Sequence, residues 1–345
     1  MTRTANRRAA LATTAVLAAS VTLAACDAGA SSSGSSKSFK AADCKAAPTG
    51  TFAQPPSGGP GGKHTVKTFM GDVEVPNSPK RVVVLDTAEL DSAITLGVKP
   101  VGATRADVES GFLDYLPEDK VGGIKDVGVI ASPNMEAVAA LKPDLILTSK
   151  VRDGQRYEQL KAIAPTVMTE TTGYPWKENF TTHADALGRI PEAKKVTAAY
   201  EAHAEKVDKA LSGNAATKNL TTNVVRFIEG ADTRVYGCES YVSSVLNDAG
   251  LAPTDFVEGA KDGLMVEVSP EQINKADSGT VFYTSYGSKE KSREGRITGG
   301  ALWKNMTAVK DGKSFRVDDQ LWIQGIGYTA ADKILDEVQK RLAKR

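Results

Sequence analysis

The chain has 345 residues, 43 of them Lys or Arg and 42 Asp or Glu, so its formal net charge is only +1. This balance argues against a nucleic-acid-binding protein, which needs a strongly basic face. With 41% hydrophobic and 25% charged residues, the composition is that of a soluble globular protein and not of a disordered one. The length exceeds what one simple core accommodates and suggests two lobes of ordinary domain size.

Residues 1–25 have the pattern of a signal peptide. Three arginines precede an apolar stretch over residues 9–25, which is short for a membrane-spanning helix. The stretch ends in LAAC at residues 23–26, which resembles the lipobox of bacterial lipoproteins. This resemblance implies that Cys26 is lipidated, becomes the mature N-terminus and anchors the protein to the outer face of the cell membrane. A plain export signal with an incidental cysteine is the alternative.

Lipidation of Cys26 would divide the three cysteines into an anchor and a pair. Removal of residues 1–25 leaves 40 basic and 42 acidic residues, a slightly acidic chain that still contains Cys26, Cys44 and Cys238. Cys44 and Cys238 are then an even pair in an oxidising compartment, where disulfides persist. The sequence leaves open whether they are bonded, because it does not give the distance between them.

Residues 26–62 are rich in Ser, Gly, Ala and Pro, with a Ser/Gly run at residues 31–36. Such a composition offers little apolar surface to bury, so it predicts a flexible tether. The glycine-rich end at residues 57–63 lacks the glycine spacing of a phosphate-binding loop. It is interpreted as the end of the tether.

From residue 63 onward, short apolar runs alternate with helical patterns, which is typical of α/β proteins. The second half repeats the order of the first, although diffusely. The predicted strands are residues 81–85, 98–103, 145–147, 223–228 and 280–283, and the predicted helices are residues 88–96, 132–141, 240–248 and one starting at residue 269.

Residues 191–211 predict one long helix between the two halves. Val196, Tyr200, Val207 and Leu211 recur at helical spacing after an initial proline. A helix of this size is about 30 Å long, enough to connect two lobes, whereas a surface helix within one domain is the alternative. The predicted divisions are a signal peptide (1–25), a tether (26–62), an N-terminal lobe (63–190), the connecting helix (191–212) and a C-terminal lobe (213–345).

Residues 65–345 resemble the solute-binding proteins of siderophore and cobalamin ABC importers. The resemblance implies a class III periplasmic-binding-protein-like α/β fold, with two lobes of central β-sheets flanked by helices and joined by one long helix. It also implies a monomer, not an enzyme, that binds its ligand between the lobes and delivers it to a membrane permease. It rests on the order of short pieces behind the lipobox: PNME at 133–136, ALKPDLI at 140–146, AIAPTV at 162–167, YGCES at 236–240, and Trp303 with VKDG at 309–312 before Trp322.

The resemblance further implies that one acidic residue near a helix start in each lobe pairs with basic residues of the permease. Glu136 and Glu271 match this pattern, and each lies ten residues before the middle of a predicted strand. An exposed carboxylate in a first helical turn is favoured by the helix dipole and stays available to a charged partner. The alternative is that each glutamate only stabilises its own helix.

Ligands of α/β proteins bind in a cleft at the ends of strands. Arg105 follows a predicted strand, and Arg226 lies inside an apolar one, where an unpaired guanidinium is costly. Each can face an anionic or oxygen-rich ligand, but an internal acid for Arg226 and plain exposure for Arg105 are the alternatives. Aromatic side chains suit a large chelate. The aromatic candidates are Trp176, Tyr236, Tyr286, Trp322 and Trp303, the last being favoured for core packing.

Two cleft arginines and several aromatics favour a near-neutral or cationic ferric hydroxamate over a tris-catecholate, with cobalamin and haem as alternatives. No set of His, Tyr and carboxylate ligands at matched spacing points to a metal held by the protein, so iron is expected only inside its chelator and no cofactor is expected. The rival hypothesis, a surface lipoprotein enzyme, needs an activated nucleophile beside a base. The sequence contains no Gly-x-Ser-x-Gly elbow.

Overall fold

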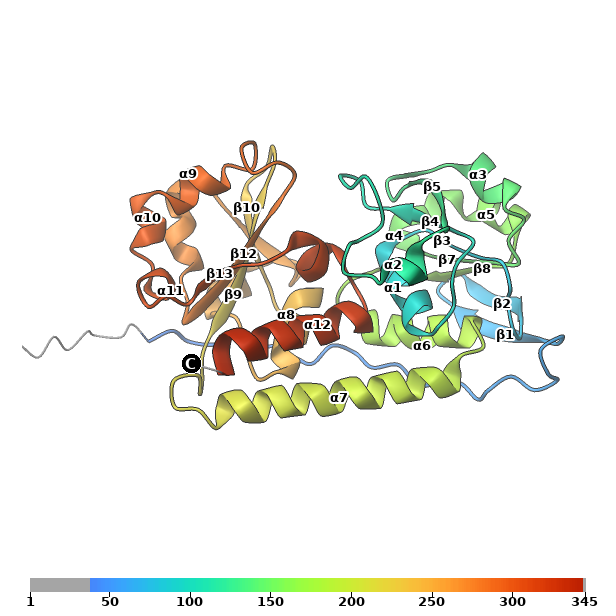
Figure 1. Ribbon diagram of the computed structural model, residues 1–345, viewed down its shortest axis with the longest axis horizontal. Coiled ribbons are helices and arrows are strands. Elements are labelled where there is room, and N and C mark those ends of the chain that lie inside the picture. Colours follow the sequence, from blue (N-terminus) through green and yellow to red (C-terminus); the bar gives the residue numbers. More distant parts are fainter. Residues whose placement is uncertain (1–37, 344–345) are drawn as a thin grey trace, which may run out of the picture. The chain divides into compact units, whose positions relative to one another are not determined.

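The structure, a computed structural model, describes residues 38–343. Two lobes each contain a β-sheet flanked by helices, and one long helix runs along both of them (Figure 1). This arrangement confirms the predicted α/β class with two central sheets. The lobes share a hydrophobic core that includes Phe180 of the first lobe, Tyr241 and Tyr328 of the second, and Tyr200 of the connecting helix.

The N-terminal lobe contains a hairpin, a larger sheet and short helices. Its strands are β1 (Lys63–Thr68), β2 (Gly71–Pro76), β3 (Val82–Val84), β4 (Gly102–Arg105), β5 (Lys125–Val129), β6 (Ser132–Pro133), β7 (Leu145–Ser149) and β8 (Thr166–Thr169). Its helices are α1 (Thr87–Thr95), α2 (Glu118–Val121), α3 (Met135–Ala140), α4 (Lys150–Asp153), the 3-10 turn η1 (Gly154–Arg156), α5 (Tyr157–Ile163) and α6 (Trp176–Ala186). The larger sheet has the order β6-β5-β4-β3-β7-β8 and is parallel except for β6.

The C-terminal lobe is built on a mixed sheet with the strand order β11-β10-β9-β12-β13. Its strands are β9 (Thr222–Ile228), β10 (Thr233–Tyr236), β11 (Met265–Val268), β12 (Thr280–Tyr286) and β13 (Ser314–Arg316). Its helical segments are α8 (Tyr241–Asp248), η2 (Asp255–Gly259), η3 (Pro270–Ala276), α9 (Glu294–Thr298), α10 (Ala301–Lys304), α11 (Thr307–Lys310), η4 (Gln320–Gln324), α12 (Tyr328–Val338) and η5 (Gln339–Ala343).

The predicted repeat of the two halves holds only in part. In each lobe, the strand that follows the Glu136 or Glu271 segment pairs in parallel with the first strand of the sheet, β7 with β3 and β12 with β9. By contrast, β10 pairs antiparallel with β9, whereas β4 is parallel to β3. The segment after Ser269 is also a 3-10 turn and not the α-helix that the pattern Ser-Pro-Glu predicts.

The connecting helix α7 (Ile190–Ser212) lies along both lobes, opposite the upper edges of the two sheets in Figure 1. It buries one stripe, to which Tyr200, Ala204, Val207 and Leu211 contribute, at the helical spacing that the sequence shows. Within residues 38–343, no helix combines the length and the apolar character needed to cross a membrane.

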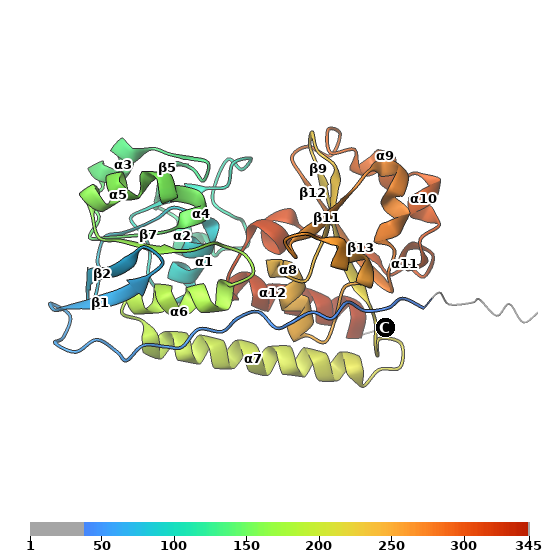
Figure 2. The ribbon, with the colours of Figure 1, turned by 180° about the vertical axis from the view of Figure 1, so that it is seen from behind.

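Residues 38–62 differ from the flexible tether that their composition predicts. They run as an extended strap from the C-terminal lobe to the β1–β2 hairpin, alongside α6 and α7 (Figure 2). At one end, Ala41 forms a bridge with Thr254, and Cys44 is disulfide-bonded to Cys238 with a Cα–Cα distance of 5.2 Å. At the other end, Asn77 donates hydrogen bonds to backbone carbonyls of residues 57 and 59. Backbone hydrogen bonds and one covalent bond therefore order a segment that has few large apolar side chains.

Candidate ligand-binding cleft

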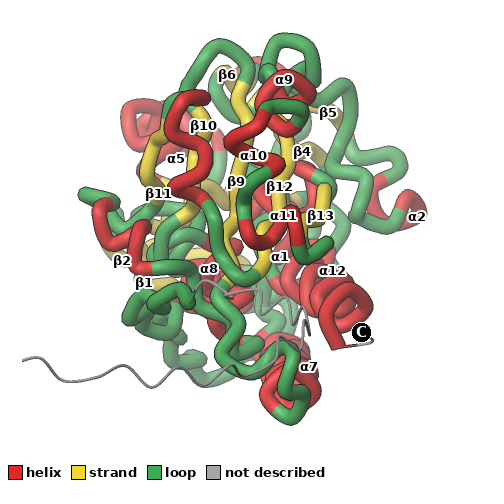
Figure 3. Tube along the Cα trace, turned by 90° about the vertical axis from the view of Figure 1, so that its left-hand side faces the viewer, coloured by secondary structure: helices red, strands yellow, loops and turns green. Residues whose placement is uncertain are grey.

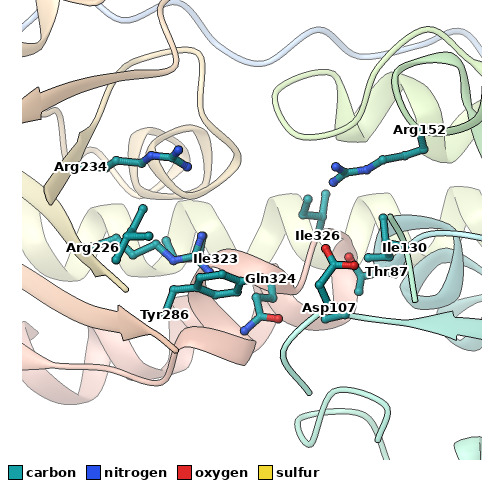
Figure 4. A pocket seen from close by; sticks show the side chains of 12 residues that line it. Thr87, Asp107, Ile130, Arg152, Arg226, Arg234, Tyr286, Ile323, Gln324 and Ile326 are labelled. Carbon is teal, nitrogen blue, oxygen red and sulfur yellow. The ribbon is translucent and has the colours of Figure 1, made fainter. Parts of the chain in front are cut away.

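A cavity of about 350 Å³ lies between the two lobes, at the carboxyl ends of several strands (Figure 4). Figure 3 views the C-terminal lobe end-on and shows β9 and β12 of its sheet side by side. The N-terminal lobe contributes residues that follow β3, β4, β5 and β7, and the C-terminal lobe contributes residues of β9, β10 and β12 and of the segment before α12. Parallel sheets generally place ligands at these ends. The lining residues are Thr87, Ala106, Asp107, Ile130, Arg152, Arg226, Ile228, Arg234, Tyr286, Ile323, Gln324 and Ile326.

Arg152 is the basic group that the N-terminal lobe presents to the cleft. It lies on α4, just after β7, and its Nε donates to Oδ2 of Asp86 at 2.7 Å. Asp86 is completely buried at the end of β3, where it also caps α1. The charge of Asp86 raises the pKa of the Arg152 guanidinium, whereas burial raises the pKa of the Asp86 carboxyl group. The terminal nitrogens of Arg152 have no partner among residues 38–343 and point toward the cavity in Figure 4.

Arg226 is the best-anchored basic group on the opposite side. Its Nε donates to Oδ1 of Asp319 at 2.8 Å and its Nη2 to Oδ2 of the same carboxylate, a bidentate pair that is largely buried. The Tyr286 ring lies 4.3 Å from the guanidinium carbon. Arg226 therefore pairs with an internal acid and also lines the cleft, so its ion pair does not exclude a role in ligand binding.

Arg234 is directly opposite Arg226 in the antiparallel pair of β10 and β9. Like charges in such a cross-strand pair are destabilising. On the other side of β10, Glu267 of β11 is opposite Arg234, and its carboxylate is 3.8 Å from the Arg234 Nε. This nitrogen makes no hydrogen bond within the described part of the chain. Arg226 is hydrogen-bonded to Asp319, whereas Arg234 has only the more distant Glu267. The two adjacent guanidinium groups therefore create a positive surface that an anionic ligand would neutralise.

Asp107 and Tyr286 add polar groups to the cleft. Asp107 is the single acid among the described lining residues, and its Oδ1 accepts a hydrogen bond from the Ala131 N–H at 3.0 Å. Burial, together with the Asp107 charge, raises the pKa of Tyr286, so its hydroxyl is a neutral donor. The cleft therefore offers three guanidinium groups and one phenol to a ligand, against one carboxylate.

Several residues predicted to bind ligand lie elsewhere in the described structure. Arg105 is not among the residues that line the cavity, because its guanidinium donates to Asp126 at 2.9 Å and to the Glu109 carbonyl. Tyr236 is also absent from the cavity lining and is buried beside Arg226. Of the five aromatic candidates, only Tyr286 lines the cavity.

The three tryptophans are core residues. Trp303 packs against Phe227 and Tyr283, in agreement with the role that the sequence favours for it. Trp322 is completely buried, with its ring centroid 4.5 Å from that of Phe282. Trp176 lies at the start of α6 and not in an open loop, and it packs within a cluster of aromatic rings, those of Tyr200, Tyr241 and Tyr328. The prediction that Trp176 and Trp322 line the cleft fails because both indoles face the shared core.

The two predicted docking residues are both exposed. Glu136 lies in the first turn of α3, which Asn134 caps by accepting a hydrogen bond from the Ala137 N–H. Glu271 lies in the first turn of η3, where its own backbone N–H and the Ser269 side chain lower its pKa. Both glutamates are therefore accessible to a partner, and their role stays a prediction.

Arg152, Arg234 and Asp107 were missed in the sequence. Arg152 follows the predicted strand 145–147 by only a few residues, so the same strand-end rule that selected Arg105 could have found it. Asp107 follows Arg105 at the end of its strand in the same way. For Arg234 the sequence carries no comparable signal, because its exposure to the cleft depends on how β10 pairs with β9.

Comparisons with known proteins agree with this geometry. The chain is 36% identical over 290 residues to the "Probable siderophore-binding lipoprotein YfiY" of Bacillus subtilis, covering 81% of this chain and 88% of that protein. It is 28% identical over 284 residues to the "Iron(3+)-hydroxamate-binding protein FhuD" of the same organism, covering 80% and 83%. The crystal structure of Staphylococcus aureus SirA complexed with staphyloferrin B matches with a TM-score of 0.72 and 30% identity, covering 81% of this chain and 98% of SirA.

The match to a family model extends over most of both lobes. Residues 82–321 match the model described as periplasmic binding protein. This range contains the two sheets, the connecting helix α7 and all but three of the residues that line the cleft. The fold, the cleft and the sequence match lead to the same conclusion. The chain belongs to the periplasmic binding protein family.

Proposed function

We propose that this protein is an extracytoplasmic solute-binding lipoprotein that captures a ferric siderophore in the interlobe cleft and delivers it to an ABC importer. The observation that carries the proposal is a cavity lined from both lobes by convergent arginines. The names of the relatives support it, since they are siderophore- and iron-chelate-binding proteins and not enzymes. Lipidation at Cys26, which lies outside the described residues, would hold the protein at the outer face of the membrane.

The chemistry of the cleft bears on the class of siderophore. The hydroxamate class predicted from the sequence is supported by the relative FhuD. The cleft adds a specific observation in favour of a chelate that carries anionic groups, because three guanidinium groups line it against one carboxylate. Guanidinium groups donate hydrogen bonds but have no lone pair for a metal, so we propose that iron enters inside its chelator and that the protein needs no cofactor.

Binding should be measured by isothermal titration calorimetry, because none of the three tryptophans lines the cleft as a fluorescence reporter. The panel is ferrioxamine B as a hydroxamate, ferric citrate as an anionic carboxylate chelate, a ferric tris-catecholate, cobalamin and haem. We expect tight binding of at least one ferric siderophore and weaker binding of its iron-free form. Binding of cobalamin or haem alone would favour those alternatives, and no binding at all would overturn the proposal.

Substitution of Arg152 tests the cleft directly. Arg152→Gln should weaken the binding of an anionic ferric chelate by about 10- to 100-fold, because a hydrogen bond to a charged group contributes about 1.5–3 kcal/mol. The affinity of Arg152→Gln for a hydroxamate chelate without anionic groups should fall less than its affinity for an anionic one. The matched control is Arg156→Gln, which removes a neighbouring guanidinium that pairs with Asp153 and does not line the cleft. Equal affinities for the wild type and Arg152→Gln would contradict the assignment.

A further inference from the structure

A buried carboxylate of the N-terminal lobe caps a helix of the C-terminal lobe. Asp91 lies on α1 and is completely buried. Its Oδ1 accepts a hydrogen bond from the Thr329 N–H at 3.1 Å, and its Oδ2 accepts one from the Ala330 N–H at 3.2 Å. These N–H groups belong to the first turn of α12, which has no capping side chain of its own. Asp91 therefore supplies the missing cap from the opposite lobe.

Two further side chains hold Asp91 in this position. The Tyr115 hydroxyl donates to Oδ2 at 2.8 Å, and the Thr95 hydroxyl is 3.1 Å from Oδ1. Thr95 also lies 2.6 Å from the hydroxyl of Thr329, which belongs to the other lobe. The Asp91 side chain thus accepts four hydrogen bonds, two from each lobe, and its oxygens face the positive end of α12.

The chain before α12 contains two glycines that permit this close approach. A Cβ atom at Gly327 would collide with the carboxylate of Asp91, and one at Gly325 would lie 2.5 Å from the Tyr115 ring. Gly327 also has a φ of +153°, a backbone conformation that residues other than glycine rarely adopt. The backbone of residues 325–327 is therefore held directly against Asp91 and Tyr115.

The segment held in this way forms part of the ligand cleft. Ile323, Gln324 and Ile326 line the cavity and immediately precede α12. Gln324 also donates hydrogen bonds to Glu109 of the N-terminal lobe at 3.2 Å and to Asp319 at 2.9 Å. Asp319 is the carboxylate that orients Arg226. The position of α12 is thereby linked to that of a cleft arginine.

We propose that Asp91 is a positioning residue for ligand capture. It caps α12 from the opposite lobe and so fixes the position of residues 323–326, the segment before α12 that lines the cleft. The inference rests on the proposed function only in that the cleft is the ligand site. Asp91 also sets the separation between the arginines of the two lobes. On one side, α1 starts directly after Asp86, which pairs with Arg152. On the other side, α12 follows the segment that contains Asp319, which pairs with Arg226.

The test compares Asp91→Asn with a matched capping carboxylate inside one lobe. Asp277 is buried in the C-terminal lobe, where it accepts hydrogen bonds from Thr307 Oγ1 at 2.9 Å and from the Ala308 N–H at the start of α11. Asp277→Asn therefore weakens a buried cap whose hydrogen-bond donors, Thr307, Ala308 and Ser278, belong to the C-terminal lobe. Tyr115→Phe, which removes one hydrogen bond to Asp91, serves as the milder variant if Asp91→Asn does not fold. Two quantities are measured well below the melting temperature. Hydrogen exchange of the ligand-free full-length protein gives the exchange rates of its backbone amides, and calorimetry gives the affinities for ferric citrate and ferrioxamine B.

We expect Asp91→Asn to raise the exchange rates of residues 323–331 and to weaken chelate binding, each on the order of tenfold. Tyr115→Phe should change both in the same direction by less, and Asp277→Asn should change neither. Wild-type exchange and affinity in Asp91→Asn would overturn the proposal, as would equal changes in Asp277→Asn. If the wild type binds no ferric chelate, the proposed function fails, whereas the exchange of residues 323–331 still decides whether Asp91 fixes this segment.

Discussion

Reversing the charge of both Glu136 and Glu271 to Lys should abolish siderophore uptake by cells while leaving ligand affinity within about twofold of the wild type. Both carboxylates are exposed in the first turns of α3 and η3, and neither lines the cleft. In Figure 1, α3 lies on the side of its lobe away from α7, and η3 packs against α10 in the other lobe. A permease with a basic residue for each lobe would meet two lysines in place of two glutamates.

The controls for this experiment are glutamates in similar local positions. Glu178 in the first turn of α6 and Glu258 in η2 are exposed and acidic, but α6 lies beside α7 and η2 lies beside the strap. The Glu178→Lys, Glu258→Lys protein should support normal uptake. Uptake is measured with radiolabelled ferric siderophore in cells that lack the native protein, and affinity by calorimetry. Normal uptake by the Glu136→Lys, Glu271→Lys protein would remove the docking role.

Removing the disulfide by a Cys44→Ser, Cys238→Ser exchange should lower the free energy of unfolding by about 3–5 kcal/mol. The bond closes a loop with a sequence separation of 194 residues, which contains the whole N-terminal lobe and α7. Such a long loop restricts the unfolded chain strongly, so its loss stabilises the unfolded state. Denaturant unfolding of the oxidised wild type and of the variant measures the difference.

The variant should also release the strap at the end that the bond holds. Apart from the disulfide, residues 40–44 are held by the Ala41 bridge to Thr254 and by backbone hydrogen bonds to Pro253 and Asp255. Hydrogen exchange of residues 40–47 should therefore rise, whereas the Gly62 N–H at the other end of the strap, which donates to the Gly59 carbonyl, should exchange as in the wild type. Reduction of the wild type should reproduce the variant. Two free thiols at Cys44 and Cys238 in the denatured, unreduced wild type, or an unchanged unfolding midpoint in the variant, would contradict this prediction.

Local sequence patterns predicted the elements well where caps and periodicity are strong. Helix α1 spans Thr87–Thr95 where residues 88–96 were predicted, with Gly97 just beyond its end, and α8 spans Tyr241–Asp248 where residues 240–248 were predicted. Helix α7 lies within one residue of its predicted start, because an apolar stripe over 20 residues leaves little ambiguity. The turn η3 was less predictable, since a short Ser-Pro-Glu start does not distinguish an α-helix from a 3-10 turn.

The candidate site was predicted only in part, for reasons that are physical. Arg226 was identified because an arginine inside an apolar strand is costly to bury without a partner. In the structure its guanidinium pairs with Asp319 and also lines the cleft. Trp176 and Trp322 were misplaced because a sequence does not show whether a large apolar ring faces a core or a cleft. The strap was misassigned because composition counts apolar side chains, whereas backbone hydrogen bonds and the Cys44–Cys238 bond order this segment.

By itself, the sequence determined the α/β class, the long connecting helix, the two exposed glutamates at helix starts and the family to which the protein belongs. These features depend on periodicity, caps and short motifs, which are local properties of the chain. Tertiary structure decided which charges meet. Arg152 comes from a segment far along the chain from Arg226 and Arg234, which lie on neighbouring strands, and Asp91 hydrogen-bonds to Thr329, 238 residues away, at the start of α12. Such contacts arise when distant strands and helices pack, so no local pattern contains them.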